Sequence, residues 1–106
     1  WLVSGDTTAE LTTTGPLLSV LGGTWTNHRA SMPVGTLLVL WTDGLTESRD
    51  GHGVELGDDG LAGLVAGAMA TEATSAGFVA YLLAAARARA LDWRRDDVTC
   101  VAVRRV

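Results

Sequence analysis

Five consecutive apolar residues, Leu37–Trp41, place the strongest constraint on how this chain of 106 residues can fold. The run lies between a turn at Gly35 and the pair Asp43-Gly44, so it is too short for a helix and typical of a strand. An apolar run without alternation predicts a strand that is buried on both faces. The remaining elements must then supply the residues that cover it.

Two helices are predicted after this strand. The first follows Asp58 and Asp59, whose carboxylates favour a helix N-terminus. Its apolar positions recur at helical spacing, at Leu61, Leu64, Val65, Ala68 and Met69. The second helix begins at a cap formed by Thr74 or Ser75. Its apolar face is predicted at Phe78, Tyr81, Leu82, Ala85 and Ala86. We expect Arg87 and Arg89, near its C-terminal end, to lie on a solvated outer face.

Strands are predicted on both sides of these helices. Residues 1–3 end one strand, a turn at Ser4-Gly5-Asp6 follows, and residues 7–11 form the returning strand. Residues 12–23 are predicted to be a loop that covers the apolar side chains of Leu17, Leu18, Val20 and Leu21. Residues 24–32 are predicted as a half-exposed strand, and residues 98–103 as the closing strand. The order predicts an α+β fold with a mainly antiparallel sheet.

Composition excludes several classes of protein. The net charge is −4, and the eight basic residues are all Arg and form no stripe, which argues against a nucleic-acid partner. A mean hydropathy of +0.24 allows a core, whereas every apolar stretch is far shorter than the roughly 20 residues of a membrane span. The single cysteine, Cys100, excludes an internal disulfide and fits a reducing, cytoplasmic compartment. In a strand among valines, it is expected to be a packed residue and no nucleophile.

Two acidic groups stand at the ends of predicted buried strands. Asp43 follows the strand Leu37–Trp41, and Asp96-Asp97 precede the closing strand. If the two strands are antiparallel neighbours, Asp43 and Asp96 meet at one rim of the sheet. Carboxylates gathered in this way favour a hard divalent cation such as Mg²⁺ or Mn²⁺. The residues alone also allow a simpler interpretation, in which these aspartates only form turns.

The segments around these acids resemble a known family. Residues 35–49, which contain Thr42-Asp43-Gly44-Leu45-Thr46-Glu47, are similar to the G-D-x-L-L-L-Y-T-D-G-L-T-E-A-R segment of SpoIIE-type phosphatases. These enzymes are the bacterial branch of the metal-dependent PPM serine/threonine phosphatases. Asp96-Asp97-Val98-Thr99 resembles their closing D-D-x-T strand, and Gly15-Pro16-Leu17-Leu18 resembles their G-x-P-L loop. The resemblance runs in order over essentially the whole chain.

This resemblance implies a fold and a chemistry. The expected fold is part of a layered α-β-β-α sandwich with antiparallel sheets. Asp43 and Asp96 match family ligands of a pair of Mn²⁺ or Mg²⁺ ions, and Asp97 and Gly44 match supporting positions beside them. No catalytic residue is expected beyond the metal ligands, because a metal-bridged water attacks phosphoserine or phosphothreonine directly. The implied substrate is a phosphorylated regulatory protein, such as an anti-sigma-factor antagonist, and the resemblance also implies regulation by an upstream sensory domain.

One family motif has no match here. The G-D-x-x-G-H-G stretch, whose aspartate bridges both metals, lies upstream in the family and does not occur in residues 1–106. His52, in Asp50-Gly51-His52-Gly53, is instead interpreted as a solvated loop residue. We therefore expect residues 1–106 to be a single, truncated domain, the C-terminal portion of a SpoIIE-like phosphatase.

Two further expectations follow from such a portion. The alternative function is a catalytically incomplete phosphatase-like module that acts in protein–protein regulation. Half a sandwich also leaves a sheet face or edge uncovered, which predicts self-association.

Overall fold

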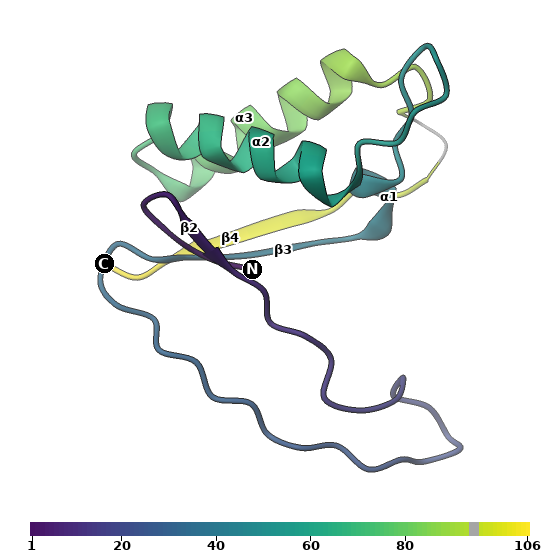
Figure 1. Cartoon of the computed structure of the whole chain (residues 1–106), viewed down its shortest axis with the longest axis vertical. Coiled ribbons are helices and arrows are strands. Elements are labelled where there is room, and N and C mark those ends of the chain that lie inside the picture. Colours follow the sequence, from purple (N-terminus) through teal and green to yellow (C-terminus); the bar gives the residue numbers. More distant parts are fainter. Residues whose placement is uncertain (94–95) are drawn as a thin grey trace.

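One antiparallel sheet with two helices on one face forms the framework of the structure, a computed structural model that describes residues 1–93 and 96–106 (Figure 1). The strands are β1 (Leu2–Ser4), β2 (Thr7–Ala9), β3 (Leu37–Trp41) and β4 (Cys100–Arg104), in the sheet order β2-β1-β3-β4. The helices are α1 (Asp43–Thr46), α2 (Gly57–Thr71) and α3 (Ser75–Arg89). The predicted α+β class is therefore confirmed. Within the described residues, no helix is long and apolar enough to cross a membrane.

The pairing of β3 with β4 positions the candidate site. The two strands are antiparallel, with Leu37 opposite Arg104 and Trp41 opposite Cys100. The end of β3 therefore lies beside the start of β4, as the sequence predicted. On its other side β3 pairs with β1, which places Val3 opposite Leu37.

Both long helices form where predicted. Thr74 is the N-cap of α3, and its side-chain oxygen accepts a hydrogen bond from the Gly77 amide at 3.0 Å. In α2, a Cβ on Gly67 would lie 2.6 Å from the Tyr81 hydroxyl, so this glycine allows α3 to pack closely against α2. The core between helices and sheet contains fully buried side chains from five elements: Val3, Leu37, Val39, Leu45, Leu61, Val65, Phe78 and Leu82.

The prediction that β3 is buried on both faces was wrong. Leu37 and Val39 face the helices and are buried, whereas the side chain of Leu40 is 50% exposed. The reason is that α2 and α3 lie on the same side of the sheet (Figure 1). The other side carries Leu38 and Leu40 of β3 beside Val103 and Val101 of β4. We call these four residues the open face.

Residues 10–36 also differ from the prediction. They contain no strand, so the strand predicted at residues 24–32 was wrong, and the returning strand ends at Ala9. The segment forms a long loop that extends away from the sheet in Figure 1. The four side chains predicted to pack beneath it are 79–103% exposed: Leu17, Leu18, Val20 and Leu21. A strand needs a neighbour for its backbone hydrogen bonds, and the sheet ends at β2 on this side.

Candidate functional site

The two predicted acidic motifs lie side by side at the end of the β3–β4 ladder. One residue beyond the last strand pair, the Thr42 amide donates to the Thr99 carbonyl at 3.1 Å. The Thr42 hydroxyl donates to the Asp97 carbonyl at 3.0 Å and accepts from the Thr99 amide at 2.9 Å. The threonine of T-D-G thus bonds to both ends of the D-x-T segment. Its role was not foreseen, because its partners are about 55 residues away along the chain.

Gly44 is the point of closest approach between the two motifs. It is buried in the short helix α1, which begins at Asp43. A Cβ on Gly44 would collide with the Asp97 carbonyl oxygen and would lie 3.4 Å from the Asp96 Cβ. Only glycine leaves room for this contact. The Cβ of Asp96 therefore lies beside Gly44, and Gly44 directly follows Asp43 in the sequence.

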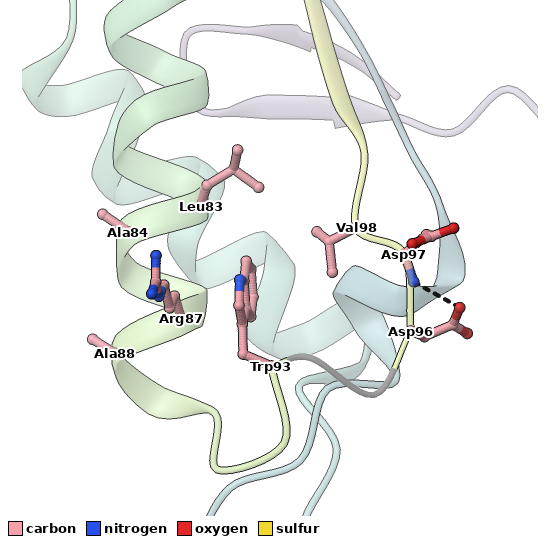
Figure 2. Close-up of a pocket in the computed structure, with 8 residues that line it drawn as sticks. All are labelled: Leu83, Ala84, Arg87, Ala88, Trp93, Asp96, Asp97 and Val98. Atoms are coloured by element: carbon pink, nitrogen blue, oxygen red, sulfur yellow. Dashed lines mark hydrogen bonds between the residues drawn. The ribbon is translucent and has the colours of Figure 1, made fainter.

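The three aspartates at this rim are exposed to solvent. The Asp97 amide donates to the Asp96 carboxylate at 2.7 Å, which orients the Asp96 side chain (Figure 2). In the same view, the carboxylates of Asp96 and Asp97 extend away from Arg87 and Trp93. The Asp43 carbonyl accepts from the Glu47 amide at 2.8 Å and from the Thr46 hydroxyl at 3.2 Å, so the main chain of Asp43 is fixed by α1.

The donor set suits part of a metal site. Asp43 and Asp96 offer carboxylate oxygens, which are ligands that Mg²⁺ and Mn²⁺ prefer. In residues 1–93 and 96–106, however, no three His, Cys, Asp or Glu side chains are grouped so that they could hold an ion. The described residues therefore fit two carboxylate ligands at this rim and do not complete a two-metal centre.

Two hollows adjoin the rim, and Asp96 and Trp93 line both. A cleft of about 270 Å³ lies on the α1 side, and its lining is mostly polar: Gly44, Glu47, Ser48, Arg49, Glu55, Asp92, Trp93 and Asp96. A wider groove of about 980 Å³ lies between α3 on one side and Trp93 and residues 96–98 on the other (Figure 2). Leu83, Ala84, Ala88 and Val98 make much of its lining apolar. The rim thus opens onto both a charged cleft and an apolar groove.

Two other sequence predictions concern His52 and Cys100. His52 is exposed in the turn after α1, as predicted, and its amide donates to the Asp50 carboxylate. Cys100 is half-buried against the core, and burial raises the pKa of its thiol. A thiol that stays protonated is a poor nucleophile, which agrees with the predicted packing role.

Comparison with known proteins gives one match. The family model described as Stage II sporulation protein E (SpoIIE) matches residues 1–106. The chain belongs to the SpoIIE family. This confirms the resemblance drawn from the T-D-G and D-D-x-T motifs, and it supports a PPM-type phosphatase function, which in this family is generally metal-dependent. No curated protein and no solved structure matches the chain.

Proposed function

We propose that this chain supplies the T-D-G and D-D-x-T portion of a metal-dependent phosphatase site, with Asp43 and Asp96 as metal ligands. The observation that carries the proposal is the pair of hydrogen bonds made by the Thr42 hydroxyl, to the Asp97 carbonyl and from the Thr99 amide. These bonds fix the two segments that carry Asp43 and Asp96 against each other through the protein's own atoms. Such preorganisation reduces the cost of bringing two carboxylates together.

The reaction proposed is hydrolysis of phosphoserine or phosphothreonine. Mn²⁺ or Mg²⁺ held by these two residues would supply an activated water and would neutralise charge on the phosphoryl group. The protein's own residues would hold the cation and orient its ligands. Asp43 and Asp96 offer carboxylate oxygens to the cation, and the Asp97 amide orients the Asp96 carboxylate. Gly44 allows α1 to approach Asp96 and Asp97, just before β4, closely enough for this arrangement.

Family membership also supports a proposal for the substrate and setting. The substrate is proposed to be a phosphorylated regulatory protein in the cytoplasm, such as an anti-sigma-factor antagonist, and an upstream sensory domain would control the reaction. The rim is exposed and opens onto a wide groove, so a phosphorylated side chain on a folded protein could reach it.

A second candidate is a catalytically incomplete module that acts through protein contacts. The observation that favours it is the donor set, because Asp43, Asp96 and Asp97 lie at the rim and yet the described residues form no group of three metal-binding side chains. The open face supplies an apolar surface for such contacts.

A calorimetric Mn²⁺ titration separates the two candidates. We expect saturable binding to the chain, and loss of about tenfold or more in affinity in Asp43→Asn and in Asp96→Asn, since each substitution removes a charged ligand. Asp6→Asn is the matched control, because Asp6 is exposed in the β1–β2 turn at the opposite end of β3. Binding that all three variants retain would show that the ligands are assigned wrongly. Absence of binding in the parent chain would favour the incomplete module.

A further inference from the structure

The last residue of α3, Arg89, reaches across to the loop of residues 48–55 that joins α1 to α2. One nitrogen of its guanidinium, Nη2, donates to the Asp50 carboxylate at 3.2 Å, to the Val54 carbonyl at 3.0 Å and to the Glu55 carbonyl at 3.2 Å. The other, Nη1, lies 3.5 Å from the Ser48 carbonyl. The Arg89 side chain is only 30% exposed. The prediction that it lies on a solvated outer face was therefore wrong.

Asp50 is the centre of the loop that Arg89 contacts. Its Oδ1 accepts from the amides of His52 and Val54 at 2.9 and 3.0 Å, while its Oδ2 accepts from Arg89. The backbone hydrogen bonds from Val54 and His52, together with the charge of Arg89, lower the pKa of Asp50. One ionised carboxylate thus connects the inside of the turn to the end of α3.

A second set of bonds fixes Arg49, the residue just before Asp50. Its amide donates to the Asp92 carboxylate at 2.8 Å, and its carbonyl accepts from the Leu91 amide at 2.8 Å. Its guanidinium forms an ion pair with Glu55 and donates to the Gly53 carbonyl at 3.2 Å. Arg49 and Glu55 both line the cleft beside Asp96. The position of the loop therefore determines where the Arg49 guanidinium and the Glu55 carboxylate lie next to the rim.

We propose that Arg89 is a positioning residue that fixes the loop of residues 48–55 to the end of α3 and thereby holds Arg49 and Glu55 in the cleft. A guanidinium suits this role because its planar donors serve several carbonyls and a carboxylate at once. A lysine at this position would keep the charge, but its side chain is shorter and has no counterpart of Nη1, the nitrogen that lies beside the Ser48 carbonyl. The role belongs to the chain itself and does not depend on whether a metal binds at Asp43 and Asp96.

The test compares Arg89→Gln and Arg89→Lys with the matched control Arg87→Gln, two residues earlier on α3, where the side chain is exposed. The first readout is residue-resolved amide hydrogen exchange. In Arg89→Gln we expect the His52 and Val54 amides to exchange about tenfold faster or more, because the loop opens locally. The Val39 amide in the sheet, which donates to the Trp1 carbonyl, should keep its rate. Arg87→Gln should leave all three rates unchanged.

The second readout is the pKa of the Asp50 carboxyl, followed by carbon NMR. The Asp50 carboxyl group faces Arg89 and His52, and the ion pair of Arg49 with Glu55 lies on the same loop. Arg89→Gln should raise this pKa toward its ordinary value, because a cation and the ordered turn are both lost. Arg89→Lys should restore most of the pKa shift but only part of the exchange protection, since it returns the charge without the planar donors.

Three outcomes would overturn the proposal. The first is unchanged loop exchange in Arg89→Gln. The second is an equal acceleration at Val39, which would make Arg89 a general stabiliser of the fold. The third is full recovery of exchange protection in Arg89→Lys. Should Arg89→Gln not fold, Asp50→Asn removes the same contact from the loop side. Because Asp50 is itself the acceptor of the His52 and Val54 amides, this variant is judged by the exchange rate of the Leu56 amide, which donates to the Ser48 carbonyl at 2.9 Å.

Discussion

The two faces of the sheet carry similar apolar residues, but the side chains on one face are buried and those on the other are exposed. In β3, Leu37 and Val39 point toward α2 and α3 and are completely buried, whereas Leu38 and Leu40 alternate with them on the open face. In β4, Cys100 and Ala102 lie on the helix side, and Val101 and Val103 remain 46% and 50% exposed. Hydrophobicity alone therefore does not decide burial. What decides it is whether another element lies over that face.

The open face is the side on which the family resemblance implies a second sheet. Both helices cover the opposite side, and the elements of the described residues all belong to one sheet or lie on its helix side (Figure 1). Glu10 and Leu11 border Leu38 and Leu40 at one edge of the open face. An apolar surface of this kind on a sheet is typical of an interaction site.

The largest expected difference between the two faces is in stability. Phe78→Ala, on the helix side, should lower the free energy of unfolding by about 3–5 kcal/mol, because a fully buried ring leaves a cavity. Val101→Ala on the open face should cost about 1 kcal/mol or less, as expected for a half-exposed strand position. Urea denaturation followed by circular dichroism measures both. Equal losses would mean that the open face is covered in solution.

The next effect concerns association. We expect the chain to self-associate through the open face, and Leu40→Thr combined with Val103→Thr should shift it toward monomer at the same concentration. Both substitutions place threonine, whose β-branched side chain suits a strand, while removing apolar area. Multi-angle light scattering across a concentration series reads the mass directly. A parent chain that is monomeric throughout the series would contradict the expectation.

The smallest expected effect concerns the chemical reactivity of the Cys100 thiol. Cys100 lies toward the helix side, and burial raises the pKa of its thiol. Because the thiolate is the reactive form, alkylation by iodoacetamide at pH 8 should be slower in the folded chain than in the same chain in urea. Mass spectrometry over time gives both rates. A folded chain that reacts as fast as the unfolded one would show that β4, an edge strand, opens readily.

Local patterns predicted the elements that depend on near neighbours. The spacing of Leu61, Val65 and Ala68 placed α2, and the Thr74 cap placed the start of α3. The apolar run placed β3, and its antiparallel pairing with the closing strand brought Asp43 and Asp96 to one rim as predicted. Each of these predictions needs only a periodicity, a cap or one strand pairing.

The remaining features depend on partners that are distant in sequence. Nothing in the run Leu37–Trp41 says which face the helices will cover, and nothing in residues 24–32 says that no strand lies beside them. Arg89 looks like any basic residue at a helix C-terminus until its acceptors, 34 to 41 residues earlier, are seen. The metal-ligand roles of Asp43 and Asp96 stay predictions, since geometry brings the segments together without testing what binds there.

The hydrogen bonds of the Thr42 hydroxyl have a consequence for how the chain folds during its synthesis. Its partners Asp97 and Thr99 are synthesised about 55 residues after it, so a growing chain holds T-D-G long before it can form the rim. The contacts that close this end of the sheet are non-local in sequence, and non-local contacts form late. A nascent or clipped chain without β4 would keep Asp43 yet lack its counterpart. Completion of folding would then coincide with completion of the rim where we propose that a metal binds.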